Sequence, residues 1–348
     1  MKYKRKEIDR AGFALIGDEP FERQQAMELV TDWRKSHLPV LRELNEELTA
    51  LLSKHGISFE FSSQRIKRMQ SIVEKIRNNK EGNMGLGGLH DIGGIRFVFP
   101  DTITLEKVET VILSYVPQHF TLKKIYDYIS SPKVSGYRSI HYVYKYHSEN
   151  QELDGLQIEL QIRTTIQHSW AMAVETASLI SGTSLKASLQ DGSVWRGFFK
   201  LVCAIFSKLE DKAVLPGYEH YSDEQLYQEY FSYSNKHKLV DTLRALRVDV
   251  DFEGYKLAGD CCCVLVIDFI NKRVKIKYFD SKEEVLASEL FSKIEHSITS
   301  KEAALMVSMK KIEKLQKAYP SYFLDTEMFI EVLNEFEEKC KLDFLKHK

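Results

Sequence analysis

The sequence is poor in the residues that build cross-links and rigid turns. It has five cysteines and seven prolines in 348 residues, and three of the cysteines are consecutive, Cys261 to Cys263. This arrangement provides neither a disulfide framework nor a C-x-x-C metal pair, and it favours a reduced, cytoplasmic setting. We expect the three cysteines to lie in a strand with alternate residues buried.

Two further absences narrow the class of protein. No apolar run approaches the ~20 residues that a transmembrane helix needs, and the basic N-terminus lacks the apolar stretch of a secretory signal. The net charge is −1, so polyanion binding requires a local cluster of basic residues. With 43% hydrophobic and 28% charged residues, the composition is that of a globular protein with no membrane role.

Hydrophobic periodicity predicts an α+β protein with a mixed β-sheet flanked by helices. Helices are predicted for residues 21–54 with a kink or break at Pro39, from 71 onward, and for 105–115, 165–179 and 195–209. Strands are predicted for residues 57–67, 95–99, 120–129, 139–146 and 156–163, the last two as an antiparallel pair.

A break at Pro216-Gly217 divides the predicted organisation. We expect an N-terminal helical segment (1–55), a catalytic domain (56–217) and a smaller C-terminal α/β regulatory domain (218–348). The last is predicted to contain helices to about residue 246, a hairpin of residues 263–270 and 274–279, and two closing helices.

Three basic residues at the end of the first predicted strand form a candidate phosphate site. Arg65 and Lys67 are two apart on one face of an extended segment, and Lys75 lies about one turn into the next helix. A triphosphate requires several converging cations, so these residues are candidate ATP contacts. Taken alone, the same spacing also fits a solvated basic face.

Two carboxylates are candidate metal ligands. Asp91 lies between a glycine-rich segment and a buried strand, and Glu159 lies on the polar face of strand 156–163. Mg²⁺ prefers one or two carboxylates together with substrate phosphates. Taken singly, Asp91 also fits a turn cap and Glu159 an exposed strand position. The pair His90-Asp91 resembles the metal-binding dyad of phosphohydrolases, but no further histidines stand at ligand spacing.

A loop aromatic is the candidate base contact. Tyr137 follows a glycine, and its ring can stack on a nucleobase. The donors around it in the sequence are Lys133, Arg138 and His141. The alternative is a plain β-turn with a packed tyrosine. His168 and Trp170, on the next helix, are interpreted as packing residues that support the site.

Over residues 55–180 these motifs together resemble the synthetase domain of the RelA/SpoT superfamily. The motifs are Ser63–Lys67 with Lys75, His90–Arg96, Ser131–His141 and Ile158–Thr164. The resemblance implies a nucleotidyltransferase-like fold and transfer of the β,γ-pyrophosphate of ATP to a ribose 3′-hydroxyl. Such in-line chemistry depends on charge neutralisation and positioning.

The resemblance also implies a role for each motif residue. The implied ATP contacts are Arg65, Lys67, Lys75 and Arg96. The implied acceptor contacts are Lys133, Tyr137, Arg138, His141 and Gln161. Asp91 and Glu159 are implied to bind Mg²⁺, either of them assisting deprotonation of the hydroxyl, while Tyr137 stacks on the acceptor base at the catalytic centre.

Further segments resemble the toxic small alarmone synthetases, especially the fused toxin–antitoxin CapRel type. They are Trp33–Pro39, Gln167–Glu175, Trp195–Phe199 and Tyr319–Thr326. This implies pyrophosphate transfer to the 3′-CCA end of tRNA, which blocks translation in phage defence. It also implies inhibition by the C-terminal domain until a phage protein such as the major capsid protein binds.

Within that domain, Tyr319 and Tyr322 are implied to reach towards the ATP site. Their alternative role is to anchor a turn between two helices. The region lacks spaced cysteine and histidine ligands, so we predict no zinc.

Two other functions remain in competition. The runner-up is a (p)ppGpp or (p)ppApp synthetase with the same ATP half-site and a nucleotide acceptor. Housekeeping synthetases usually carry a Glu-His pair where this chain has Glu175-Thr176, which weighs against GTP or GDP. The third is a catalytically silent nucleotide sensor or phage-binding module. The presence of both Asp91 and Glu159 weighs against it, because a decayed enzyme would usually have lost one of them.

Overall fold

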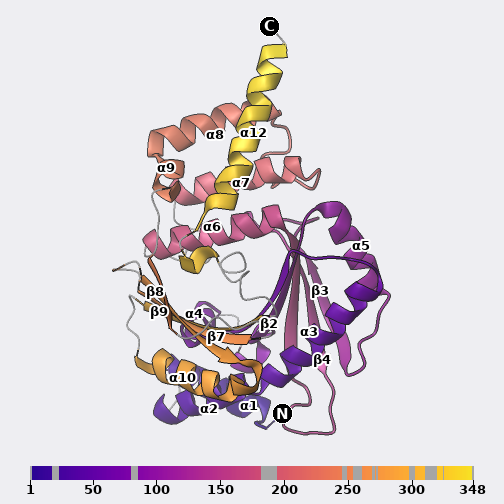
Figure 1. Cartoon of the computed structure of the whole chain (residues 1–348), viewed down its shortest axis with the longest axis vertical. Helices are drawn as coiled ribbons and strands as arrows, with labels where there is room; N and C mark the ends of the chain where they lie inside the picture. Colours follow the sequence, from indigo (N-terminus) through magenta and orange to yellow (C-terminus); the bar gives the residue numbers. More distant parts are fainter. Residues whose placement is uncertain are drawn as a thin grey trace.

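The computed structural model describes residues 2–17, 23–79, 85–181, 194–244, 249–253, 261–268, 271, 273–297, 302–309, 320–323 and 325–346. Their strands form one mixed sheet in the order β3-β4-β5-β2-β1-β9-β7-β8-β6 (Figure 1). The strands are β1 Phe61–Ile66, β2 Gly93–Phe99, β3 Phe120–Asp127, β4 Ile140–Tyr146, β5 Gln157–Thr164, β6 Asp249–Glu253, β7 Cys261–Asp268, β8 Arg273–Asp280 and β9 Glu302–Met309. The predicted fold class is confirmed.

Helices cover both faces of the sheet (Figure 1). Those before β5 are α1 Arg5–Leu15, α2 Arg23–Lys35, α3 His37–Lys54, α4 Met69–Asn78, the short η2 Leu86–Gly88 and α5 Thr102–Leu113. Those after β5 are α6 Thr165–Ser181, α7 Val194–Leu209, α8 Asp223–His237, α9 Leu239–Arg244, η3 Ser281–Glu283, α10 Glu284–Ser297, η5 Pro320–Phe323 and α12 Glu327–Lys346. Within the described parts of the chain, no helix is long and apolar enough to span a bilayer.

The alternation in β5 explains how the sheet separates its core from its functional face. Ile158, Leu160 and Ile162 are fully buried in the cluster that α3 and α5 complete. The intervening polar residues face the opposite side, which α6 crosses. Strand β5 is antiparallel to β4 and parallel to β2, so polar positions of three strands line up on one face.

A second hydrophobic cluster joins the helices after β5. Phe198 and Phe206 of α7 pack with Tyr230 of α8 and Phe329 of α12, and each is at most 2% exposed. This cluster continues across residue 217, where the sequence predicts a domain boundary. The three-domain division remains a prediction.

One strand near the C-terminus was not predicted. Residues 302–309 form strand β9, which pairs antiparallel with both β1 and β7. The segment is rich in alanine, leucine and methionine, which are strong helix formers. Pairing along both edges overrides this local preference, because a central strand satisfies its backbone groups on each side. Strand β6 was also not predicted.

The prediction for the consecutive cysteines is half correct. They lie in β7 as expected, but Cys262 and Cys263 are both buried, at 2% and 0% exposure. Neighbouring residues of a strand point to opposite faces, so both faces of β7 are covered at this point.

Candidate active site

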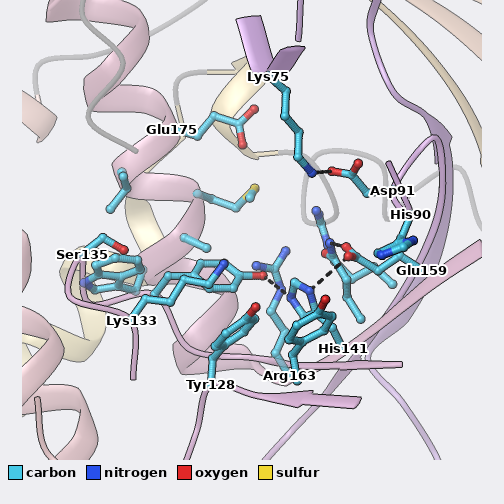
Figure 2. Close-up of a pocket in the computed structure, with 18 of the residues that line it drawn as sticks. Lys75, His90, Asp91, Tyr128, Lys133, Ser135, His141, Glu159, Arg163 and Glu175 are labelled. Atoms are coloured by element: carbon cyan, nitrogen blue, oxygen red, sulfur yellow. Dashed lines mark hydrogen bonds and ion pairs between the residues drawn. The ribbon is translucent and has the colours of Figure 1, made fainter. Parts of the chain in front are cut away.

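The polar face of the sheet opens into a cavity of about 450 Å³ (Figure 2). Its walls come from β1, β2, β4, β5, the end of β3, and helices α4, α6 and α7. Of the residues predicted from the sequence, those that line it are Arg65, Lys75, Asp91, Arg96, Lys133, Tyr137, His141, Glu159 and Gln161. The structure thus brings all four sequence motifs to one cavity.

Asp91 organises the end of the cavity near α4. Its Oδ2 accepts hydrogen bonds from Lys67 Nζ at 2.8 Å and from Lys75 Nζ at 3.0 Å. Burial alone would raise the pKa of Asp91, but the two ammonium groups hold it well below its usual range. The carboxylate is therefore ionised and places two cations beside the cavity.

The other oxygen of Asp91 has the properties expected of a metal ligand. Oδ1 is buried and has no hydrogen-bond partner among the described residues. Burial and the nearby charge of Asp91 act to raise the pKa of Glu159, although His141 and Gln161 lower it overall. A divalent cation relieves such repulsion and accepts oxygen ligands, so the donor set fits Mg²⁺. The described residues contain no cluster of three or more candidate metal ligands, which leaves the remaining positions to substrate oxygens and water.

A hydrogen-bonded chain of three residues forms the other end of the site. The Tyr137 hydroxyl lies 2.9 Å from His141 Nε2, and His141 Nδ1 lies 3.4 Å from Glu159 Oε2. Gln161 Nε2 donates to the remaining Glu159 oxygen at 2.7 Å. Figure 2 shows the contact between His141 and Glu159. Glu159 therefore faces both the Asp91 end and the Tyr137 end of the cavity.

Charges within this group of hydrogen-bonded residues shift the pKa values of His141 and of the Tyr137 hydroxyl. Burial would lower the pKa of His141, but Tyr137 and Glu159 raise it to about 9. Burial would raise the pKa of Tyr137, but His141 and Arg163 lower it to about 7. His141 is thus a cation in the neutral range, and its proton is shared towards an acidic tyrosine.

The loop before Tyr137 supplies an aromatic and cationic wall. Lys133 Nζ lies 4.0 Å from the centre of the Tyr128 ring and 5.3 Å from that of Tyr137. The two rings are 6.1 Å apart in an edge-to-face arrangement. A planar base fits such a wall, since each ring offers a stacking surface and the lysine a donor.

Two predicted residues with described side chains, Lys67 and Arg138, lie outside the cavity lining, and two others cannot be placed relative to it. Lys67 acts through its ion pair with Asp91. Arg138 is 4% exposed and pairs with Glu210 of the α7 end at 2.8 Å, so it is not placed to contact an acceptor directly. Tyr319 lies outside the described residues, and Tyr322 falls in η5 with its side chain outside the described part.

Sequence reasoning missed part of the lining. The additional residues with polar or aromatic side chains are Asn79, His90, Tyr126, Tyr128, Ser135, Arg163, Trp170, Glu175, Arg196 and Phe199. Arg163 shares its strand face with Glu159 and Gln161, and this alternation was the signal that could have identified it. Arg196 belongs to α7 and to the segment Trp195–Phe199, whose resemblance to the toxic synthetases implied no site role for it.

Arg163 is the most buried cation of the cavity. It is 1% exposed, and its Nε and one Nη have no hydrogen-bond partner among the described residues. Burial and the nearby Arg96 lower its pKa to about 9. Among the described residues, six lysine and arginine side chains, two histidines and three carboxylates line the cavity. This excess of positive charge suits a polyphosphate.

Comparison with known proteins agrees with this arrangement. Residues 64–179 match the model of the region found in RelA / SpoT proteins. GTP pyrophosphokinase YjbM of Bacillus subtilis is 33% identical over 115 residues, which is 32% of this chain and 53% of the relative. The probable GTP diphosphokinase RSH3 of Arabidopsis thaliana chloroplasts is 35% identical over 127 residues, 35% of this chain and 16% of the relative. The chain thus spans about half or less of these relatives.

Solved structures with similar folds include two from Bacillus subtilis. Small alarmone synthetase 1 bound to its product pppGpp gives a TM-score of 0.42 and 23% identity, covering 52% of this chain and 93% of that one. Small alarmone synthetase 2 gives 0.42 and 22%, covering 53% and 91%. Residues 64–179 of this chain are thus similar to the region found in RelA / SpoT proteins.

Proposed function

We propose that this protein is a pyrophosphotransferase that moves the β,γ-pyrophosphate of ATP to a ribose 3′-hydroxyl. One observation carries the proposal: a single cavity holds a cationic end around Asp91 and an aromatic end around Tyr137, with Glu159 between them. The match to the RelA/SpoT region and the names of the relatives, GTP pyrophosphokinase and GTP diphosphokinase, support the same chemistry.

The chain's own residues account for the main requirements of the transfer. Arg65, Lys75 and Arg96 neutralise the triphosphate, and the wall around Tyr137 orients the acceptor base. The 3′-oxygen attacks the β-phosphorus, the bond from the β-phosphorus to the bridging α-oxygen breaks, and AMP leaves. Asp91 and Glu159 would hold Mg²⁺, which would supply positive charge to offset that of the phosphates.

Glu159 is the better placed of the two carboxylates to receive the hydroxyl proton. Asp91 is neutralised by two lysines of the donor end. Glu159 instead contacts His141 and Gln161 of the acceptor end, where the hydroxyl must lie. The acceptor proton therefore passes to Glu159 Oε as the oxygen–phosphorus bond forms.

For the acceptor, we propose the 3′-CCA end of tRNA in a fused toxin–antitoxin system of the CapRel type. In this proposal the C-terminal region restrains the enzyme until a phage protein, such as a capsid protein, binds. The support is the sequence resemblance together with exposed basic residues beside the acceptor wall, which suit a phosphate backbone: Lys123, Lys124 and Lys133.

A second candidate is a (p)ppGpp or (p)ppApp synthetase. The names of the relatives favour a guanosine acceptor. The Glu175 carboxylate in the cavity lining also offers an acceptor for the N–H groups of a purine. Both candidates use the same donor half-site.

The proposal is tested with γ-³²P-ATP and Mg²⁺, offering the full chain tRNA, GTP, GDP and ATP as competing acceptors. Wild type and Tyr322→Ala are compared, since the proposal expects release of restraint in the variant, and Asp91→Asn serves as the inactive control. Label on tRNA that disappears when the terminal adenosine is removed supports the toxin. Label on nucleotides alone supports the alternative, and no label on any acceptor contradicts the proposed activity.

A further inference from the structure

A buried ion pair connects the C-terminal region to the helices before the catalytic strands. Arg34 of α2 and Glu295 of α10 form a bidentate contact, with Nη1 to Oε2 at 2.6 Å and Nη2 to Oε1 at 3.2 Å. Their side chains are 3% and 8% exposed. The guanidinium also lies 5.6 Å from the centre of the Phe291 ring of α10. Low exposure and bidentate geometry make this a well-determined contact.

Both members of the pair bind the backbone beside the proposed ATP site. Arg34 Nε donates to the carbonyl oxygen of Lys67 at 2.9 Å, and the Met69 amide donates to Glu295 Oε1 at 2.7 Å. The Lys67 amide in turn donates to the carbonyl of Ile92, next to Asp91, at 2.8 Å. The turn between β1 and α4 is therefore fixed on both sides.

Glu295 also replaces a missing helix cap. Met69 is the first residue of α4, and the N-cap residue Arg68 makes no side-chain capping bond. A carboxylate at this position satisfies a free amide and interacts favourably with the helix dipole. Helix α4 carries Lys75, and the turn before it carries Lys67. The Glu295 carboxylate, 226 residues from Met69 in the sequence, therefore fixes the backbone that carries both lysines bound to Asp91.

From these contacts we propose that Glu295 is a positioning residue of the donor half-site. It acts through Arg34 and the Met69 amide to hold Lys67 and Lys75 where they neutralise the donor phosphates. The inference rests on the proposed function and deepens it, because it gives one residue of the C-terminal region a part in positioning the ATP contacts.

The first test is Glu295→Gln in the full chain. Glutamine keeps the shape but loses the charge and one of the two accepting oxygens. We expect the KM for ATP to rise about tenfold, the effect of losing a charged hydrogen bond. The kcat at saturating ATP and the KM for the acceptor are expected to change less than about twofold.

A matched control lies on the same helix. Glu284, the first residue of α10, forms an ion pair with Arg42 of α3. Glu284→Gln removes a carboxylate of the same kind from the same helix, where its contacts are with Arg42 of α3 and Ser308 of β9 and not with residues 67–69. Its KM for ATP should equal that of the wild type. A rise equal to that of Glu295→Gln would overturn the proposal in favour of a general loosening of α10.

The double variant Arg34→Met/Glu295→Leu separates positioning from stability. Apolar replacement of a buried ion pair is often neutral or stabilising. We expect a melting temperature close to that of the wild type together with a raised KM for ATP. An unchanged KM for ATP in a folded double variant would overturn the proposal. If neither Glu295→Gln nor the double variant folds, the ion pair has a purely structural role and the proposal is also overturned.

Hydrogen exchange at the Met69 amide tests the Glu295 contact without depending on transferase activity. Faster exchange in Glu295→Gln than in Glu284→Gln supports the clamp on residues 67–69 independently of catalysis. If the wild type has no transferase activity but the Met69 amide still exchanges faster in Glu295→Gln than in Glu284→Gln, the proposed function is contradicted and the clamp is supported. Unchanged exchange counts against the clamp, whatever the activity.

Discussion

Tyr137 combines two chemical roles in one side chain, because its ring faces the cavity while its hydroxyl contacts His141. Tyr137→Ala removes a stacking surface worth roughly 1–3 kcal/mol, so the KM for the acceptor should rise about tenfold or more. Tyr137→Phe keeps the stacking ring, so the KM for the acceptor should change less than about threefold. Steady-state kinetics with varied acceptor measures both, and equal losses would contradict a stacking role.

His37 gives the protein a stability that depends on pH. Burial lowers its pKa to about 4, while its Nδ1 lies 3.0 Å from the carbonyl oxygen of Trp33. Below the usual pKa of 6.5 the unfolded chain takes up a proton that the folded chain does not, so the free energy of unfolding falls as the pH falls. Stability from this residue is complete above pH 6.5 and declines towards about pH 4.

The magnitude follows from the same two pKa values. Between about pH 7.5 and about pH 5, wild type should lose about 2 kcal/mol more stability than His37→Gln. Urea unfolding of both proteins at the two pH values measures the difference. Identical losses would show that His37 does not remain neutral when buried.

Among the elements of the site, the turn that carries Tyr137 combines a left-handed backbone with close packing. Gly136 has φ +91°, and an added Cβ would lie 2.9 Å from Cys203 Cβ and 2.9 Å from Trp170. Gly136→Ala should therefore displace the turn and lower transferase activity at least about tenfold.

Gly217 is the matched control for that substitution. Its φ is +97°, but an added Cβ would meet nothing within 4 Å. Gly217→Ala carries only the backbone strain, about 1 kcal/mol, and should retain activity. Activity and melting temperature of the two variants separate strain from collision, and an active Gly136→Ala would show that the turn tolerates movement.

The same elements show what the sequence can predict about this fold. The alternation in β5 indicates both the buried face and the functional face, because its period of two survives in the structure. β9 could not be predicted in this way. Its composition favours a helix, and only pairing with β1 and β7, both distant in sequence, makes it a strand.

At the scale of the whole molecule, α12 is part of the core that supports α6 and α7. The Phe329 ring lies 5.8 Å from Phe199 and 5.6 Å from Phe206, and the residue is 1% exposed. Phe329→Ala should cost about 3–5 kcal/mol of stability. The neighbouring Met328 is 44% exposed, and Met328→Ala should cost less than about 0.5 kcal/mol.

Chemical unfolding with two probes tests whether this core is shared. Because the Phe329 cluster adjoins α6, which crosses the functional face, loss of nucleotide binding and loss of helical signal should coincide in Phe329→Ala. Two separate transitions would indicate that the C-terminal helix unfolds independently of the catalytic region.

Much of the candidate site could be predicted at this scale because four short motifs contain most of it. Asp91, Tyr137 and Glu159 each lie in a segment whose local pattern already indicates a ligand. Glu295 has no such pattern, since its importance comes only from where α10 packs. Residues that act through tertiary contacts leave no periodic signal in the sequence.

Strand β1 is hydrogen-bonded on one edge to β2 and on the other to β9. Each change in its register must therefore suit two partners, one encoded about 30 residues later and the other about 240 residues later. Exchange of residues 64–179 for the equivalent stretch of a relative would bring in a strand edge selected for a different neighbour. The two halves of this protein are thus expected to have diverged as one inherited unit, with compensating changes on β1 and β9, rather than by shuffling of separate modules.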